Sequence, residues 1–526
     1  MSLTKSLMII LTVLIAGLIL HGKELNENNL NNKSNNFSDG YTLFAPTGSR
    51  DTYLIDMNGK TVHEWSHNRS GGYSVYLLEN GNILRTAQAS NRVFDGGGSQ
   101  GYVQEVDWDD NLVWEFEYSS STYLAHHDIE PMPNDNVLII AWELKSASEA
   151  SAAGRKNSST IWPDHVIEVD KSSSQIVWEW HAWDHLVQDY DPTKANYGVV
   201  ADHPELIDVN LSANGGGPRG GGDWLHMNGI SYNPTLDHII ISSHYTNEIY
   251  IIDHSTTAEE AKGHTGGKSG KGGDILYRWG KPANYDASGT QYFSVIHSPF
   301  WIPYDYPGGG NILVFNNGTD QRESSIIEII PPIQADGRYT FTSGSGYGPN
   351  QPAWLYSNGR SFYSSHQGGC QRLANGNTLI TDPDNGYLFE VNQAKQKVWE
   401  YGYGDQIARS IRYSPDYKGL SKLLGTGVNR KKIATELPTE FALEQNFPNP
   451  FNAATTIQFS LPKTTTVTLT VYNELGEKVA TLVKNQINNA GTHSSLLDAT
   501  GLSTGIYFYR LETNEFVQVK KMILLQ

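Results

Sequence analysis

Apolar and polar positions alternate along most of this chain in short runs, and many runs end on a Trp or Tyr beside an acid. This phrase, an apolar strand, a turn and a second strand, occurs six times. The copies are YLIDMNGKTVHEW (53–65), VQEVDWDDNLVWEF (103–116), VIEVDKSSSQIVWEW (166–180), IYIID to ILYRW (249–279), IIEII to AWLY (326–356) and LFEVNQAKQKVWEY (388–401). Alternation with a period of two over runs of this length predicts β-strands rather than helices.

A second phrase separates the copies: a turn rich in Asn and Gly that leads into an apolar run. Its examples are NGNILRT (80–86), NDNVLIIAW (134–142), GGNILVF (309–315) and NGNTLIT (375–381). A β-rich unit used six times predicts a closed ring of blades. The last copy ends in the strand type with which the first begins, which favours closure by strands from both ends of the ring. We therefore expect an all-β fold with a six-bladed β-propeller at residues 41–415.

The chain beyond the repeats changes character. Residues 416–437 are polar and partly basic, and we interpret them as a linker. Residues 438–526 alternate with a period of two between regularly spaced turns, which predicts a small immunoglobulin-like antiparallel β-sandwich. Within the ring, the segments 184–222, 254–273 and 333–352 lengthen individual copies. They are rich in Gly, Ser and Asp, so we expect inserted loops, where binding surfaces are built.

The first 22 residues carry a lysine, an apolar run and a small or polar exit, which predicts a signal peptide. An uncleaved N-terminal anchor is the alternative, but the run is short for a membrane span. Residues 23–40 are Asn-rich with few large apolar groups, and we interpret them as a disordered linker. These features predict a protein exported from the cell.

The composition of the chain excludes some classes of binding partner. The net charge is −18, which argues against a nucleic-acid partner, because phosphate binding needs clustered Lys and Arg. Cys370 is the single cysteine of the 526 residues, so no disulfide can form within the chain. An export signal without disulfides suits a bacterial envelope protein that is stabilised by core burial.

Histidines interrupt the repeat at equivalent points. His126 and His127 precede one β-rich run, His226 and His297 precede two others, and His366 holds the matching place in the last copy. Equivalent points on successive blades lie at one radius and height, so we expect these side chains to converge on the axis.

Convergent histidines have two chemical interpretations: a transition-metal site, or nucleophilic and acid–base catalysis. The sequence offers no HxxxH pair, no cysteine ligand and no evident carboxylate partner, so we expect neither a metal nor a cofactor there. Asn228 follows His226 by two residues and would point the same way on a strand, where it can donate to an oxyanion.

The C-terminal segment resembles the sorting domain of the type IX secretion system. The resemblance rests on FPNPF (447–451), VYNELGEKVATL (471–482), GLSTGIYFYRL (501–511) and KKMILL (520–525). It implies that secretion machinery is a partner and that the protein is secreted or held at the cell surface. A periplasmic location and an ordinary adhesion module are the alternatives.

The repeat region resembles the bacterial arylsulfotransferase family, which does not use PAPS. The motifs are HHDIEPMPNDNVL (126–138), DWLHMNG (223–229), HSPF (297–300) with NILVFNNG (311–318), and QRLANGNTLI (371–380). The resemblance implies a six-bladed propeller that transfers a sulfuryl group from a small aryl sulfate donor to a phenolic acceptor through a covalent sulfohistidine.

Residue roles follow from the same resemblance. His297 matches the nucleophile, and His226 with Asn228 matches an element that contacts the sulfuryl group. Either His126 or His127 matches the remaining active-site histidine, and the Asp after His127 favours His127. The nearby aromatic residues could stack on aryl rings or pack the blades; these are Trp224, Phe300 and Trp301.

One position departs from the family. Where the family has an arginine in an SSR-type motif, this chain has SSH with His244. Arginine supplies a permanent forked charge, whereas histidine is charged only when protonated. Either another group such as Arg322 takes that role, or the activity is altered or lost. His126, His244 and His366 are the other candidate supporting residues.

Three functions therefore compete. The first is an exported aryl-sulfate sulfotransferase. The second is a surface-displayed, non-catalytic binding or adhesion propeller, which His244 and the tail favour. The third is another propeller enzyme of quinone-dependent or lyase type. The first requires that His127, His226 and His297 face one another across the axis.

Overall fold

A computed structural model describes residues 37–157, 159–211, 222–334, 337–424, 440–446, 449–452, 454–488, 491–499 and 501–525. The predicted signal peptide (1–22) and most of both predicted linkers lie outside these residues. Within them, no helix has both the length and the apolar character needed to cross a bilayer.

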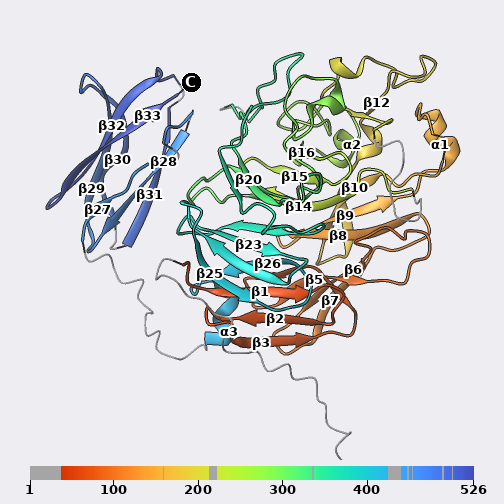
Figure 1. The fold of residues 1–526 in the computed structure, drawn as a ribbon, viewed down its shortest axis with the longest axis horizontal. Coiled ribbons are helices and arrows are strands. Elements are labelled where there is room, and N and C mark those ends of the chain that lie inside the picture. The colour runs from red at the N-terminus through yellow and green to blue at the C-terminus, as the bar shows by residue number, and fades with distance from the viewer. Residues whose placement is uncertain are drawn as a thin grey trace, which may run out of the picture.

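Six four-stranded antiparallel sheets follow one another around a ring in the described residues (Figure 1). We number these blades by chain order and give each from its innermost strand outward. Blade 1 is β26 (Ile407–Tyr413), β1 (Tyr41–Pro46), β2 (Asp51–Ile55) and β3 (Thr61–Ser66). Blade 2 is β4 (Gly71–Leu77), β5 (Ile83–Gln88), β6 (Gly101–Val106) and β7 (Leu112–Glu117). Blade 3 is β8 (Tyr123–Pro131), β9 (Val137–Glu143), β10 (Asp164–Asp170) and β11 (Gln175–His181).

The other three blades have the same order. Blade 4 is β14 (Met227–Asn233), β15 (His238–Ser243), β16 (Glu248–Asp253) and β17 (Tyr277–Trp279). Blade 5 is β18 (Ile296–Trp301), β19 (Ile312–Asn316), β20 (Ser325–Ile329) and β21 (Trp354–Ser357). Blade 6 is β22 (Gly369–Arg372), β23 (Thr378–Asp382), β24 (Tyr387–Val391) and β25 (Lys397–Gly402).

The ring closes in blade 1 with strands from both ends, as the repeat predicts. β26 pairs antiparallel with β1, and Tyr41 lies opposite Tyr413. The innermost strand of the first blade is therefore the last strand of the ring, so neither end leaves an open sheet edge on the inside.

Short helices and one small parallel strand pair lie in the connections. They are α1 (Ala147–Ala152), η1 (Ala182–Asp184), β12 (Leu186–Val187), η2 (Val200–Asp202), β13 (Ile207–Asp208), α2 (Ala258–Ala261), η3 (Pro282–Tyr285), η4 (Lys418–Leu420) and α3 (Ser421–Leu424). The predicted insertion 184–222 holds η2 and the β12–β13 pair, and 254–273 holds α2. Both insertions therefore have structure of their own.

The C-terminal region forms a second all-β unit. Its two antiparallel sheets have the orders β27-β28-β31 and β30-β29-β32-β33. The strands are β27 (Ala442–Leu443), β28 (Ala454–Leu461), β29 (Thr465–Asn473), β30 (Lys478–Asn488), β31 (Gly491–Asp498), β32 (Gly505–Thr513) and β33 (Val517–Leu524). Phe459 of one sheet and Leu469 and Tyr509 of the other belong to one buried cluster. The predicted propeller followed by a small β-sandwich is confirmed.

The repeated tryptophan ties each blade to the next one. In each of the six copies the indole Nε1–H of this tryptophan donates to a turn or connection of the following blade, at 2.8–3.3 Å. The pairs are Trp65 to the Asp107 carbonyl, Trp114 to Ser174 Oγ, Trp178 to Thr256 Oγ1, Trp279 to the Pro349 carbonyl, Trp354 to the Gln393 carbonyl and Trp399 to the Met57 carbonyl. The last pair returns from blade 6 to blade 1. The first phrase of the repeat is thus explained by contacts between blades.

The Asn-rich turns have a matching explanation. In four blades an Asn amide donates to a Glu on the third strand of the same blade, and that Glu also meets a basic side chain of the next blade. The sets are Asn82–Glu105–Lys171, Asn136–Glu168–His254, Asn311–Glu328–Arg372 and Asn377–Glu390–Arg412. Buried charge needs such pairing, so both repeated phrases specify how neighbouring blades meet.

Glu328→Gln tests this tie. The carboxylate of Glu328 and the guanidinium of Arg372 are 2.5 Å apart and almost fully buried. Loss of the negative charge leaves Arg372 buried without a counter-charge, so we expect the free energy of unfolding to fall by about 3–5 kcal/mol. Urea unfolding followed by tryptophan fluorescence measures it. Glu79→Gln, which breaks the exposed pair with Lys418, should cost at most about 1 kcal/mol, and equal losses in both variants would contradict the role of burial.

Candidate active site

The inner strands of the ring carry a kink at one equivalent position. Four residues there have a left-handed backbone: His127 (φ 53°), His226 (φ 52°), Ser298 (φ 48°) and Gln367 (φ 59°). The strand pairing of β8, β14 and β18 shifts by a β-bulge at or beside these residues. Bulges redirect side chains and recur next to active sites. Here the kinks bring polar side chains of successive blades to the axis.

Five histidines form a continuous chain at this place. Ring centroids are 5.1 Å apart for His126–His127, 4.6 Å for His127–His226, 4.9 Å for His226–His244 and 5.7 Å for His244–His297. Burial, followed by the charges of neighbouring histidines, places the pKa of His127 and of His244 well below the usual range. The rings of His127 and His244 are therefore neutral. The structure also brings His127, His226 and His297 into one chain, as the sequence predicts.

Two carboxyl groups lie against this chain of histidines. Asp223 Oδ2 is 2.5 Å from His226 Nδ1, and Asp164 Oδ1 is 3.1 Å from His126 Nε2. Burial and the charge of Asp223 raise the pKa of Asp164 well above its usual range. With Asp223 as the acceptor, His226 donates from Nδ1 and keeps the lone pair of Nε2 for another proton. His226 therefore has the geometry of a general base.

The environment of His297 fixes its tautomer. Its Nδ1 lies 2.7 Å from Asn317 Oδ1, and its Nε2 accepts the backbone N–H of Gln367 at 3.2 Å. Since a backbone N–H can only donate, Nε2 carries the lone pair and Nδ1 carries the proton. Burial lowers the pKa of His297 to about 3. The ring is thus a neutral imidazole at physiological pH, the form that acts as a nucleophile.

Asn228 is fixed between two neighbouring strands. Its Nδ2 donates to the carbonyl of Ile296 at 2.7 Å, and its Oδ1 accepts from Ser242 Oγ at 2.6 Å. A carboxamide nitrogen has two N–H groups, so one remains beyond the bond to Ile296. Asn228 lines a small cavity together with His127 and His297, which agrees with the expected place of this donor.

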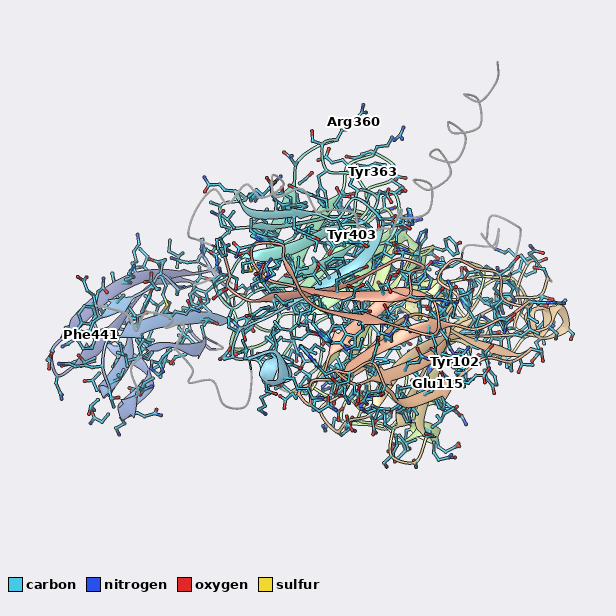
Figure 2. The ribbon with its side chains drawn as sticks, turned by 90° about the horizontal axis from the view of Figure 1, so that it is seen from below. Tyr102, Glu115, Arg360, Tyr363, Tyr403 and Phe441 are labelled. Atoms are coloured by element: carbon cyan, nitrogen blue, oxygen red, sulfur yellow. The ribbon has the colours of Figure 1, made fainter. Side chains whose placement is uncertain are left out.

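The remaining sequence candidates lie differently. His244 belongs to the buried chain but is neutral, so it supplies no positive charge. His366 has a side chain that is 49% exposed and faces Asp384 at 3.1 Å, outside the buried chain. Arg322 is exposed, and its guanidinium lies 5.7 Å over the ring of Tyr363, which belongs to a loop that projects from the ring of blades (Figure 2). No contact between Arg322 and the histidines exists within the described part of the chain.

Arg409, a cation that the structure places at the axis, was not among the residues predicted from the sequence. Arg409 lies on β26 and donates to both carboxylate oxygens of Asp128, at 2.8 and 3.0 Å. It lines the small cavity beside His127 and His297. The available signal was a charged residue in the middle of an apolar closing strand, IARSIRY. Gln367 was also not predicted. The sequence prediction assigned the axial position in the last blade to His366, which precedes it by one residue.

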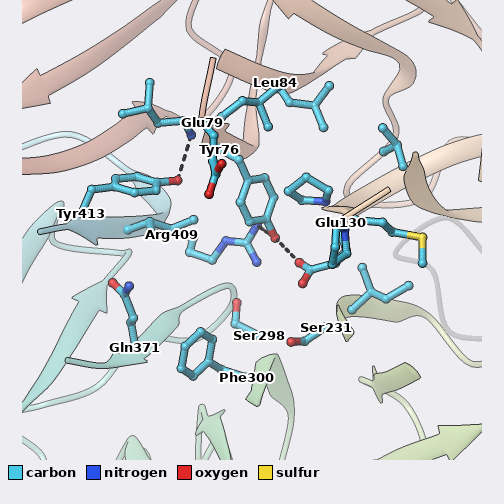
Figure 3. A pocket seen from close by; sticks show the side chains of 18 of the residues that line it. Tyr76, Glu79, Leu84, Glu130, Ser231, Ser298, Phe300, Gln371, Arg409 and Tyr413 are labelled. Carbon is cyan, nitrogen blue, oxygen red and sulfur yellow. Dashed lines mark hydrogen bonds between the residues drawn. The ribbon is translucent and has the colours of Figure 1, made fainter. Parts of the chain in front are cut away.

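Two cavities lie along the axis. The small one, of about 20 Å³, is lined by His127 and His297 of the histidine chain and has room for about one water. A larger one, of about 750 Å³, lies towards the carboxyl ends of the inner strands, and Ser298 and Arg409 are common to both walls (Figure 3). Phe300 lines the larger cavity, whereas Trp224 and Trp301 are buried in the packing between blades.

A carboxyl group in the larger cavity is held in its protonated form. Glu130 accepts from Tyr76 OH at 3.0 Å, and Arg409 donates to the same tyrosine at 2.8 Å (Figure 3). Burial and the charge of Asp128 raise the pKa of Glu130 to about 8. The wall of this cavity is thus less negative at neutral pH than its composition suggests.

Glu130→Gln tests that protonation. A carboxyl whose folded pKa lies above its unfolded value stabilises the fold below the unfolded pKa, and this stability is lost as pH rises through about 8. Glutamine mimics the protonated form, so we expect the variant to gain stability over the native chain as pH rises from about 5 to 9. Thermal unfolding at several pH values measures it. A constant difference, like that expected of the surface variant Glu79→Gln, would contradict the assignment.

Comparison with known proteins adds to this geometry. The sequence model of the family described as arylsulfotransferase (ASST) matches residues 26–418, and that of a secretion system C-terminal sorting domain matches residues 445–525. No curated protein matches the chain.

Several solved structures are similar in part. A protein of unknown function from Bacteroides caccae has a TM-score of 0.39 and 11% identity, over 71% of this chain and 99% of its own. The periplasmic gluconolactonase of Pseudomonas aeruginosa has a TM-score of 0.33 and 11% identity, over 88% and 99%. Virginiamycin B lyase of Staphylococcus aureus has a TM-score of 0.29 and 8% identity, over 81% and 94%.

Proposed function

Since the chain belongs to the arylsulfotransferase family, we propose that it transfers a sulfuryl group from an aryl sulfate to a phenol through a covalent intermediate on His297. The observation that carries this proposal is the tautomer of His297. Asn317 holds its Nδ1 proton, and the lone pair of Nε2 faces the backbone N–H of Gln367 in a cavity that His127 also lines. A nucleophile needs such a lone pair, and a buried imidazole of lowered pKa keeps it at neutral pH.

The first step forms the intermediate. The lone pair of His297 Nε2 attacks sulfur, the bond between sulfur and the aryl oxygen breaks, and the phenolate leaves with that electron pair. The N–H of Gln367 must turn away from Nε2 for this attack. It then lies where it can donate to a sulfuryl oxygen, together with the remaining N–H of Asn228.

The second step restores His297 and leaves one proton on His226, which then passes to solvent or to the released phenolate. A phenol oxygen attacks sulfur, the bond between sulfur and Nε2 breaks, and its electron pair returns to His297. His226 takes the phenol proton at Nε2, because Asp223 holds its Nδ1 proton and stabilises the imidazolium that forms. The aryl group lies outside the cluster, since the small cavity holds no more than about one water.

The family supports a transferase, and the C-terminal sorting domain supports export to the cell surface or the medium. We propose that the protein encounters its aryl sulfate donor and its phenolic acceptor outside the cell. We also propose that the secretion machinery recognises residues 445–525. A surface-displayed binding propeller without catalysis is the competing function, since His244 stands where the family has arginine.

Incubation of the purified protein with 4-nitrophenyl sulfate and phenol tests the transfer. We expect release of nitrophenol and formation of phenyl sulfate. His297→Ala should lose at least about 10³-fold in rate, because the nucleophile is gone. Without acceptor, mass spectrometry should find one SO₃ group on the native chain at His297.

His203→Ala is the matched control for this assay, because His203 is an exposed histidine in the insertion that precedes blade 4. It should retain the native rate and the SO₃ adduct. Absence of turnover in the native chain, or equal turnover in His297→Ala, would overturn the proposal. Glycan or peptide binding that survives loss of His297 would then favour the binding propeller.

His244→Arg tests the departure from the family. A neutral His244 gives no charge to an anionic substrate, whereas arginine gives a permanent one. We expect KM for 4-nitrophenyl sulfate to fall by about tenfold. His244→Gln, which also lacks charge, should keep KM within about twofold of the native value. Tighter binding in both variants would contradict the electrostatic explanation.

A further inference from the structure

A second histidine cluster lies away from the axis, between blades 3 and 4. His185 follows η1, directly after the outer strand β11 of blade 3, while His264 and Asp274 lie in the connection from α2 to β17 of blade 4. The Nδ1 atoms of both histidines approach the same oxygen, Asp274 Oδ1, at 2.9 Å from His185 and 2.7 Å from His264. The three potential ligand atoms lie within 4.8 Å of one another.

The contacts of His185 require a cation beside Asp274. Its Nε2 lies 2.8 Å from the carbonyl of Ala261, and a carbonyl can only accept, so Nε2 carries the proton. Nδ1 therefore faces Asp274 Oδ1 at 2.9 Å, and the side chain of His185 is fully buried. A cation shared by these two atoms, either a proton or a metal ion, holds them at this distance.

The support around His185 fits a metal ligand. Metal-binding histidines commonly donate their other N–H to a backbone carbonyl, as His185 does to Ala261. The indole of Trp180 lies parallel to the imidazole and donates to the carbonyl of Gly273 at 2.7 Å. A side chain at Gly273 would meet the Ala261 carbonyl at 2.0 Å and His185 Nε2 at 2.6 Å. The ring of His185 is therefore held in one orientation.

We propose that His185, His264 and Asp274 bind one divalent transition-metal ion, with zinc as the best match. Two imidazoles and one carboxylate are ligands that suit zinc, whereas calcium and magnesium prefer sets made of oxygen alone. The side chain of His264 is 60% exposed, so the fourth position faces solvent and takes a water.

The ion would clip two blades together. His185 extends from blade 3, and the other two ligands belong to the insertion of blade 4 that packs α2 against β11. β12 begins directly after His185, so the clip also fixes the start of the 184–222 insertion. The role is structural, since none of the three residues lines either axial cavity.

Titration of the chelator-treated full chain with zinc or cobalt tests the site. We expect one zinc ion to bind per chain in this region, a rise in the melting temperature, and visible cobalt absorption typical of tetrahedral coordination. His264→Gln removes an exposed ligand without disturbing the core, and should weaken binding by at least about 100-fold. His203→Gln, which changes another exposed histidine nearby, should leave binding unchanged.

Two further variants make the outcome specific to this cluster. Asp274→Asn should also lose the ion, and circular dichroism verifies that it folds. His297→Ala removes an axial imidazole and should keep the ion, which distinguishes this cluster from the axis. Absence of zinc binding at micromolar concentration, or binding that survives both His264→Gln and Asp274→Asn, would overturn the proposal and leave a buried His185–Asp274 ion pair in its place.

Discussion

A single hydrogen bond, repeated around the ring, holds the propeller in register. Each blade ends in a tryptophan whose indole N–H reaches an acceptor on the following blade, and the sixth, Trp399, returns to Met57 of blade 1. A blade alone would leave that donor without its protein acceptor and would expose its apolar face to water. The buried Glu328–Arg372 pair adds charge to the same interface, so the blades stabilise one another rather than themselves.

The chemistry at the axis depends on this closed packing. Only a tightly packed ring can bury several imidazoles side by side, and burial is what keeps His127, His244 and His297 neutral. The kinks at His127 and His226 cost backbone strain, which the surrounding blades offset. The scaffold thereby supplies neutral imidazoles, which the proposed nucleophile and base require, at a pH where exposed histidines would be partly charged.

The fold could be predicted from the sequence because its two repeated phrases form the contacts between blades. The place of His226 and His297 could be predicted from their position in the repeat. The details at the axis were not readable. Whether a side chain enters the axis depends on which residue takes the left-handed kink: in blade 6 this is Gln367, one residue beyond His366. Spacing alone has no information on that conformation, and it could not show that Arg409 arrives from the closing strand.

The position of Arg409 has a consequence for the order of events in folding. Asp128 sits directly after His127 from blade 3, yet its counter-charge is on β26, the last strand of the ring to be synthesised. Until β26 pairs with β1, the carboxylate beside the histidine chain lacks its counter-charge, and the axis stays open to water. Formation of the proposed site is therefore coupled to closure of the ring. A chain that ends before residue 407 would lack both the Arg409–Asp128 pair and the closed ring.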